Sequence, residues 1–414
     1  MNIWYINHYA TPPSYGLPGR PYSIAINLEK LGHKVTVICA TYHHLRQSAT
    51  PSSDYFQCRK YKGVVYYHLP TRYYKGNGLV RLLNMFDFSW QVKKLSDRVE
   101  RNELMPPDVL IPSCAHPFVF PPSYKLSKIF NAKLIYEIRD IWPLSLIELA
   151  NVPSLHPIVL WFKWIEKRAY RQADAVVSLL PNALDYMVSV GLDRRKFNYI
   201  PNGIDREEWE MSSEPLPDEH QALFQHIKKE GKLVVVYAGA HGPPNALDQI
   251  LDLSKLNKEK NKPYHFILIG DGIEKEKLVK RVRDESIHFV SFLPRIEKKQ
   301  VITALRMADV CFIGWKKRSI YKYGISPNKI GDYFMCEKPV LHALDAGNDP
   351  VQEADAGISV EPYNTEKIDD ALHRFCMMSK EERGALGMNG RRYALENLDW
   401  KVLGRRYAEI CQSK

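Results

Sequence analysis

Cysteine is sparse in this 414-residue chain, and its distribution does not suggest a covalent framework. The seven cysteines are scattered, and no two of them form a Cys-x-x-Cys pair. An odd, scattered set argues against both a disulfide framework and a zinc site. We therefore expect reduced thiols and a cytoplasmic protein.

Long apolar runs are also missing. The most apolar candidate, residues 158–165, is interrupted by Lys163, and no run reaches the ~18 residues that a membrane span needs. No lysine or arginine precedes Arg20, so we expect no secretory signal peptide. These features predict a cytoplasmic protein that could still bind a membrane surface peripherally.

Several catalytic signatures are absent as well. The chain has no Asp-x-Asp, no P-loop and no Gly-x-Ser-x-Gly elbow. Sites that hold a nucleotide diphosphate through a metal generally need paired carboxylates, so we expect no metal site and no cofactor. Helix-turn-helix, zinc-finger and RNA-recognition signatures are missing too, and we expect no nucleic-acid partner.

Positive charge is concentrated in the first half of the chain. Residues 1–205 carry 25 lysine and arginine residues against 15 acidic ones, a net of +10, while the remainder has 33 against 32. Such asymmetry is typical of a half that faces an anionic surface. An anionic membrane explains it well, because each basic residue near the surface contributes about 1 kcal/mol.

Short apolar runs alternate with helical patterns along the whole chain, which predicts an α/β fold with parallel sheets. We expect strands at 3–6, 34–39, 109–112, 133–138, 175–179, 233–238, 265–269, 288–290, 310–313 and 339–341. A polar, proline-containing segment follows Asp205 and reads as a linker. We therefore predict one domain over 1–205, a second over 206–390, and a final helix within 391–414 that returns to the first.

A helix start near Ser326 carries the most functional information. Ser326 is a good N-cap and Pro327 suits the first helical position, so a helix should begin here, with Lys329 in its first turn and Asp332 in its second. Free N–H groups beside a lysine make an anion site suited to a diphosphate. A carboxylate one turn later can take the two hydroxyls of a ribose.

This segment resembles the nucleotide-sugar signature of the family-4 glycosyltransferases. Further motifs in the same order resemble that family: Gly32–Val37, Arg139–Pro143, Gln172–Val176, Tyr237–Gly239 and Gly270–Gly272. The resemblance implies the GT-B fold, two Rossmann-like domains facing a cleft. It also implies a retaining transfer of a sugar from a nucleotide diphosphate, here expected to be UDP, to an acceptor hydroxyl.

The resemblance also suggests which residues form the site. Catalytic roles fall to His116, Asp140 and Lys329. Donor contacts fall to Gly16, Arg20, His241, Arg295, Gly324, Ile325, Ser326, Pro327, Asn328 and Asp332. Family members carry two acidic residues separated by seven positions, and Gly324 stands where the first should be. That departure suggests a 6-deoxy or N-acetylated sugar read in another way, for instance by the backbone amides of 324–326, or a loss of activity.

Some of these residues also have plainer explanations. His116 lies just after a strand, where it could contact the transferred sugar or serve only the fold. Asp140 could hold the acceptor hydroxyl or simply pair with Arg139. His241 stands near a family arginine and could touch the donor phosphate or only shape a turn. The long loop 8–21, with Gly16 and Arg20, follows the first strand, where ligands bind in open α/β sheets.

Residues 79–101 mix aromatic, aliphatic and basic side chains and predict a helix that packs on the sheet. The preceding Arg72, Tyr73, Tyr74 and Lys75 add to an aromatic and basic composition suited to a membrane interface. Together with Arg81, Phe86, Phe88 and Trp90 they form the predicted membrane-binding cluster.

The most similar relatives are bacterial enzymes that build O-antigen or capsule repeats, including N-acetylfucosamine transferases. They imply an acceptor linked to undecaprenyl diphosphate, and therefore a protein peripheral to the cytoplasmic face of the inner membrane. Two rival functions stay open. One is a GT-B sugar-nucleotide epimerase, and the other is a non-catalytic scaffold of a polysaccharide assembly complex.

Overall fold

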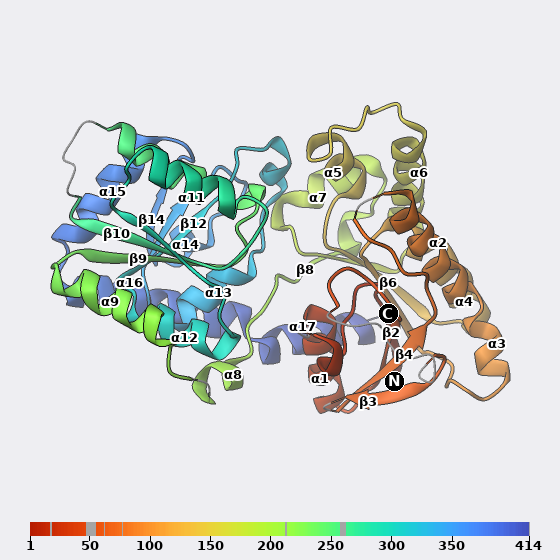
Figure 1. The fold of residues 1–414 in the computed structure, drawn as a ribbon. Helices are drawn as coiled ribbons and strands as arrows, with labels where there is room; N and C mark the ends of the chain where they lie inside the picture. The colour runs from red at the N-terminus through yellow and green to blue at the C-terminus, as the bar shows by residue number, and fades with distance from the viewer. Residues whose placement is uncertain are drawn as a thin grey trace. The chain divides into compact units, whose positions relative to one another are not determined.

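The computed structural model describes residues 1–16, 19–46, 55–61, 63–76, 78–211, 213–256 and 262–413. The chain divides into two compact units, one formed by residues 1–202 with 400–414 and the other by residues 203–399. We call them the N-terminal and C-terminal units and describe each by itself (Figure 1).

The N-terminal unit is built on an eight-stranded sheet in the order β3-β4-β2-β1-β5-β6-β7-β8. All neighbours pair in parallel except β3, which runs antiparallel to β4. Its strands are β1 (Asn2–Ile6), β2 (Lys34–Ala40), β3 (Cys58–Tyr61), β4 (Val64–Leu69), β5 (Val109–Cys114), β6 (Lys133–Ile138), β7 (Ala175–Ser178) and β8 (Phe197–Tyr199).

Helices cover both faces of this sheet. They are α1 (Arg20–Lys30), α2 (Leu79–Lys93), α3 (Leu95–Glu100), α4 (Phe120–Phe130), α5 (Trp142–Glu148), α6 (Pro157–Gln172), α7 (Leu184–Val190) and α17 (Trp400–Gln412). Apolar residues of α1 and α17 share a core with one face of the strands, and α2, α4 and α6 pack beside one another (Figure 1). The carboxyl ends of β1, β2, β5 and β6 therefore lie along one edge of the unit.

A buried carboxylate ties the last helix to this unit. Glu137 on β6 accepts hydrogen bonds from Tyr407 of α17 (3.1 Å), from Ser113 (2.7 Å) and from Tyr5. The Arg20 guanidinium pairs with it at 2.9 Å and holds the pKa of Glu137 below its usual value, against the effect of burial. Buried charges persist only when they are paired and hydrogen-bonded, so this network fixes α1, β6 and α17 together.

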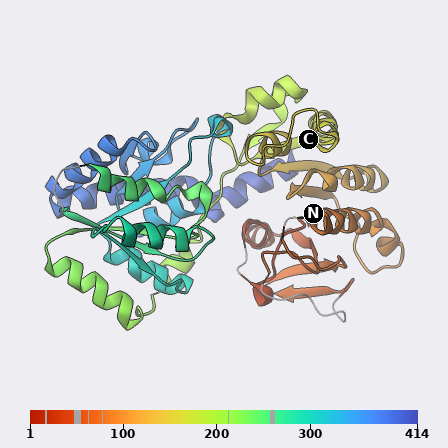
Figure 2. The same ribbon diagram turned by 45° about the horizontal axis from the view of Figure 1, so that its top comes forward.

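The C-terminal unit contains a six-stranded, all-parallel sheet in the order β11-β10-β9-β12-β13-β14 (Figure 2). Its strands are β9 (Leu233–Ala238), β10 (Tyr264–Ile269), β11 (Val290–Leu293), β12 (Val310–Gly314), β13 (Val340–Ala343) and β14 (Gly357–Val360). The completely buried residues of β9 and β10 explain why these strands read as continuous apolar runs, since parallel sheets are covered on both faces.

Two apolar layers enclose this sheet. Residues of α9, α12 and α13 pack on one face, and residues of α10, α11 and α15 pack on the other. The helices of the unit are α8 (Arg206–Met211), α9 (Asp218–Lys229), α10 (Asp248–Leu251), α11 (Lys275–Asp284), α12 (Lys298–Met307), α13 (Asn328–Met335), α14 (Pro350–Glu353), α15 (Thr365–Met377) and α16 (Lys380–Tyr393).

The structure moves several predicted boundaries. The helix expected to return within 391–414 is divided: α16 ends at Tyr393, a π-helical turn spans Ala394–Leu398, and α17 begins at Trp400. Only residues 400–414 belong to the N-terminal unit, which otherwise ends at Asn202 rather than Asp205. The strand expected at 288–290 starts at Val290, and β3, β4, β8 and β14 were not predicted.

None of the helices in the described part of the chain combines the length and the apolar character that crossing a bilayer requires.

Candidate active site

Two glycine turns form the floor of the candidate donor site in the C-terminal unit. Gly239 follows β9 and Gly270 follows β10, with φ angles of 153° and 142° that L side chains rarely adopt. The two turns touch: a Cβ on Gly270 would overlap the carbonyl oxygen of Gly239. Glycine at both positions lets the backbones approach at the carboxyl edge of the sheet, where open α/β folds bind ligands.

Lys329 lies over this floor. The helix α13 begins at Asn328 after Pro327, and no side chain caps it, so Lys329 belongs to its first turn. The Lys329 ammonium donates a 2.9 Å hydrogen bond to the Asn245 side chain and lies 5.2 Å from the centre of the Tyr237 ring. A Cβ at Gly239 would overlap the Lys329 side chain, so that glycine makes room for the lysine.

No ion pair neutralises Lys329 within the residues that the structure describes. Burial lowers its pKa to about 8, and Asp332 opposes that shift. A lysine that is largely withdrawn from water without a carboxylate partner favours an anion beside it. The uncapped N–H groups of α13 also favour a nearby anion, because the first turn of a helix leaves its N–H donors without intrahelical partners.

Asp332 lies one turn further along α13 and is already paired. Its carboxylate accepts a 2.6 Å contact from the Lys298 ammonium, which also lies 5.0 Å from the Trp209 ring. Burial raises the pKa of Asp332, and Lys298 opposes this effect. Lys298 was not among the predicted site residues, although its position at the start of α12 follows a strand end as the others do.

The segment before α13 differs from its prediction in two ways. Ser326 is not the N-cap: Pro327 holds that position and the helix begins one residue later, because Asn328 is the first residue with helical hydrogen bonding. Two of the three backbone amides proposed to read a sugar are also engaged. Gly324 donates to the Tyr321 carbonyl at 2.9 Å, and Ile325 donates to the Asn348 side chain at 2.7 Å. Gly324 has a φ of 106°, which favours glycine there.

His241 lies beneath the glycine turns and is completely buried. Neither of its ring nitrogens has a hydrogen-bond partner among the described residues, and burial, followed by the nearby Lys275, lowers its pKa to about 4. It packs against Tyr237 and Phe292. His241 is therefore neutral, and a role as a positive phosphate ligand does not fit its surroundings. Arg295, by contrast, is exposed just before α12, with its side chain in water.

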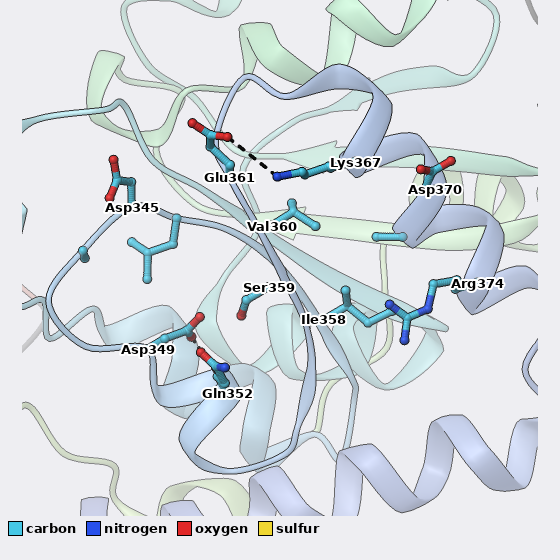
Figure 3. A pocket seen from close by; sticks show the side chains of 13 residues that line it. Asp345, Asp349, Gln352, Ile358, Ser359, Val360, Glu361, Lys367, Asp370 and Arg374 are labelled. Atoms are coloured by element: carbon cyan, nitrogen blue, oxygen red, sulfur yellow. Dashed lines mark hydrogen bonds and ion pairs between the residues drawn. The ribbon is translucent and has the colours of Figure 1, made fainter.

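A separate cavity of about 490 Å³ lies along the edge strand β14, between α14 and α15 (Figure 3). Four carboxylates line it together with Lys367 and Arg374, and Lys367 pairs with Glu361. The lining contains none of the predicted donor residues. Its acidic excess makes it a poor site for a diphosphate.

In the N-terminal unit, Arg20 was predicted to contact the donor, but its side chain binds other groups of the protein. Its Nε contacts Glu137, and its two terminal nitrogens donate to the carbonyls of Pro201 (2.5 Å) and Ile200 (3.0 Å). Each nitrogen of the guanidinium therefore already has a protein partner, and the structure gives Arg20 a place in the buried Glu137 network rather than a free charge for a donor phosphate. Gly16 is half-buried after a 3₁₀ turn; Leu17 and Pro18 of the same loop lie outside the described residues.

His116 follows β5 and is completely buried. Its Nε2 lies 2.8 Å from Nδ1 of His8, a residue that follows β1 and was not predicted as a site residue. Burial, followed by the charge of Arg81, lowers the pKa of His116 to about 3, so its imidazole is neutral. The position of His8 at a neighbouring strand end was the signal in the sequence that could have found it.

Asp140 follows β6, at the same edge of the sheet, and is exposed. Burial raises the pKa of Asp140, and the charge of the neighbouring Arg139 opposes this effect. Among the described residues, no three histidine, cysteine, aspartate or glutamate side chains are grouped as metal ligands.

The predicted membrane-binding cluster is only partly at the surface. Tyr74 and Phe88 are buried, with 2% and 0% exposure, because they pack inside the unit. Arg72 pairs with Asp87, and Arg81 stacks on Tyr9. Tyr73 and Trp90 are exposed as expected. Two exposed tryptophans outside the predicted cluster, Trp161 and Trp164 on α6, were missed.

Comparison with known proteins gives consistent matches. The family model described as Glycosyltransferase Family 4 matches residues 21–208, and the one described as Glycosyl transferases group 1 matches residues 218–393. No curated protein matches the sequence.

Several solved structures share the fold. The Anabaena protein HepE in complex with UDP and glucose is 15% identical, with full coverage of both chains and a TM-score of 0.66. An E. coli structure, described as trehalose-6-phosphate bound with UDP-2-fluoro glucose, is 13% identical, with full coverage of both chains and a TM-score of 0.74. WaaG, a glycosyltransferase involved in lipopolysaccharide biosynthesis, is 14% identical over the full length of both, with a TM-score of 0.63.

Proposed function

Because its two halves match two glycosyltransferase family models and its fold is GT-B, this chain is a glycosyltransferase, and we propose that it transfers a sugar from a UDP-linked donor to a lipid-linked glycan. The matches support a place in family 4. The proposal extends this coarser assignment to a donor, an acceptor and a membrane location.

The observation that carries the donor side is the unneutralised ammonium of Lys329 above the Gly239 turn. Its charge and the uncapped N–H groups of α13 would stabilise the negative charge that develops on the departing diphosphate. Asp332, one turn further along, would accept hydrogen bonds from the ribose hydroxyls, with Lys298 keeping its carboxylate charged. The UDP bound in the HepE structure and the UDP-linked sugar in the E. coli structure support uridine as the base.

The proposed identity of the donor sugar follows from the absence of a carboxylate at position 324. A glycine there removes the carboxylate that family members bring to the sugar hydroxyls, which favours a 6-deoxy or N-acetylated hexose such as N-acetyl-L-fucosamine. The backbone amides of Gly324 and Ile325 already donate hydrogen bonds within the protein. Side chains would therefore recognise such a sugar. We propose retention at the anomeric carbon and no metal requirement, with Lys329 in the charge-neutralising role.

The N-terminal unit would supply the acceptor side. Neutral, buried His116 is suited to a hydroxyl group rather than an anion. Exposed Asp140 at the same sheet edge is suited to holding or activating the attacking hydroxyl.

The acceptor is proposed to be lipid-linked because of a surface on α2, α4 and α6. Three exposed tryptophans, Trp90, Trp161 and Trp164, lie on α2 and α6. The exposed basic residues of these helices and of the position after α2 include Lys93, Lys94, Lys125, Lys128, Lys163, Lys167 and Arg168. We call these ten residues the tryptophan-lysine surface.

The geometry of that surface suits a membrane interface. The Lys93 and Lys94 ammonium groups lie 4.9 and 5.5 Å from the Trp90 ring centre, and the Arg168 guanidinium lies 5.3 Å from that of Trp164. A largely apolar cavity of about 440 Å³ opens between α2 and α4 beside Trp90. Tryptophan at the headgroup level with flanking lysines is the usual composition of interfacial anchors. The protein would then bind the cytoplasmic face of an inner membrane and act in O-antigen or capsule synthesis.

Ligand-induced stabilisation tests the proposal. Thermal unfolding would be followed with UDP, GDP, TDP and ADP at equal concentrations, since a ligand that binds the folded state raises its stability. UDP should give the largest rise in Tm. No shift with any nucleotide would favour the scaffold function instead. Incubation with UDP-N-acetylglucosamine alone addresses the epimerase: a changed sugar without an acceptor would support that rival.

A further inference from the structure

A row of buried polar side chains runs from α2 to His116 in the N-terminal unit. It consists of Asn84, His8 and His116, which are 0%, 1% and 0% exposed. They come from three separate elements: Asn84 lies within α2, His8 follows β1 and His116 follows β5. Buried polar groups need hydrogen-bond partners, so the row can be followed atom by atom.

The orientation of the Asn84 amide is fixed at one end. Its Nδ2 donates a 2.6 Å hydrogen bond to the carbonyl oxygen of Arg72, which can only accept. The amide NH₂ therefore points to Arg72, and Oδ1 points the other way. That Oδ1 is buried and makes no hydrogen bond among the described residues.

His8 is the neighbouring residue whose ring can donate a hydrogen bond to this oxygen. The Asn84 side chain lies near enough to His8 to raise the pKa of its imidazole, against the larger lowering caused by burial. The Nε2 of His8 is also buried and makes no hydrogen bond within the described part of the chain. Two adjacent orphan atoms, one an acceptor only, satisfy each other when His8 carries its proton on Nε2. The ring is held in plane by stacking on Phe88, with centroids 4.6 Å apart and planes 8° apart.

The ring nitrogen that carries the proton in His116 is set by the one that carries it in His8. With its proton on Nε2, a neutral His8 has only a lone pair at Nδ1, which lies 2.8 Å from Nε2 of His116. Two lone pairs cannot face each other at this distance, so His116 must donate from Nε2. Both rings are neutral: burial lowers the pKa of each, and the positive charge of Arg81 adds to the effect on each. The Nδ1 of His116 is then a bare acceptor, buried and without a partner in the described residues.

We propose that Asn84 and His8 are positioning residues that hold His116 with its proton on Nε2, so that its Nδ1 accepts a hydrogen bond from a carbohydrate hydroxyl. The proposal rests on the proposed function for the nature of the ligand. The relay makes the site selective for a donor group. A hydroxyl satisfies the bare nitrogen, whereas a fluorine, a carbonyl oxygen or a carboxylate would place an acceptor against an acceptor.

Nitrogen NMR of the full chain labelled with ¹⁵N-histidine tests the relay directly. The pattern of two-bond couplings distinguishes the two neutral tautomers, and His8→Gln and His116→Gln variants assign the signals. At pH 7 both rings should carry the proton on Nε2 only. A proton on Nδ1 of His116, or a cationic ring, would overturn the proposal.

Two substitutions at one position separate positioning from simple packing. Asn84→Leu removes the acceptor, so the histidine pair should divide between both tautomers. Asn84→Gln keeps a neutral amide that can still donate to the Arg72 carbonyl and accept from His8, and should restore the Nε2 form. If Asn84→Leu does not fold, the tautomer measured in the wild-type protein still tests the proposal.

Transfer kinetics provide a second readout, with the donor that the nucleotide panel identifies. Asn84→Leu should lower kcat/KM about tenfold, the scale of one neutral hydrogen bond, and leave UDP affinity unchanged. Asn84→Gln should recover part of the loss. Unchanged kcat/KM despite mixed tautomers would overturn the proposal. A wild type that binds no UDP would instead contradict the proposed function and leave the tautomer result standing.

Discussion

Lys329 occupies the space that a side chain at position 239 would fill. Gly239, in the turn after β9, has no Cβ, and the aliphatic part of the lysine passes over its backbone from the first turn of α13. The ammonium reaches Asn245 rather than a carboxylate. A strand-end glycine and a helix-start lysine, 90 positions apart in the sequence, together form the proposed anion site.

The lowered pKa of Lys329 predicts a pH dependence of UDP binding. An anion prefers the protonated lysine, so affinity should be highest below the pKa of about 8 and fall above it. Between pH 7 and 9 the protonated fraction drops about tenfold, and the association constant should follow. Calorimetry over this range measures it. The Lys329→Arg variant is the control, since arginine stays charged and uracil titrates equally in both proteins. Equal slopes would count against the assignment.

Asp332 should recognise the ribose. Wild type should bind UDP more tightly than its 2′,3′-dideoxyribose analogue, because the carboxylate accepts from both hydroxyls. Asp332→Asn should bind both about equally. Lys298→Met is a second test: it removes the partner at 2.6 Å that opposes the raised pKa of the buried carboxyl, and should weaken the preference for the ribose form. If the asparagine variant still prefers the ribose form as strongly as wild type, Asp332 has only a structural role.

Transfer activity should survive excess EDTA. The prediction follows from the charge that Lys329 and the start of α13 can supply to the leaving diphosphate. Initial rates with and without chelator should agree within error. A complete loss that manganese restores would require a metal in the mechanism.

The tryptophan-lysine surface should bind anionic membranes. Vesicles rich in anionic lipid should sediment the protein at low salt and release it at higher salt, because exposed charges are screened over ~10 Å at 0.1 M. Replacing Trp161 and Trp164 with serine should reduce co-sedimentation without changing UDP affinity. Met377→Ser is the control, since Met377 is 86% exposed on α15 of the other unit. Equal binding to neutral and anionic vesicles would show that the surface is not an electrostatic anchor.

Strands buried on both faces were predictable from the sequence. The buried run of β9 coincides with its predicted range, because every one of its positions is apolar or small. The edge strand β3 was missed, since Cys58, Arg59 and Lys60 are exposed and carry no apolar alternation. β-Propensity reports burial on a pleated surface, so exposed edge strands give little signal.

Side-chain roles depended on partners far along the chain. Arg20 looked like a free anion ligand because Glu137, its buried partner, is 117 residues away. His8 and His116 are separated by 108 residues, and nothing local shows that their rings meet. The place of Lys329 in the first turn of a helix was predictable because its signals, a helix start and a proline, lie within three residues of it. Local chemistry could be predicted, whereas long-range pairing required the fold.

The most direct test of the donor site compares UDP binding by wild type and Lys329→Met. Methionine keeps the length of the side chain and removes its charge, and Lys280→Met, at an exposed position on α11, serves as the control. Calorimetry at pH 7 should show Lys329→Met weakened by roughly 1.5–3 kcal/mol, the range for a hydrogen bond to a charged group, and Lys280→Met unchanged. Equal affinity in all three proteins, with intact thermal unfolding, would contradict a donor diphosphate at Lys329.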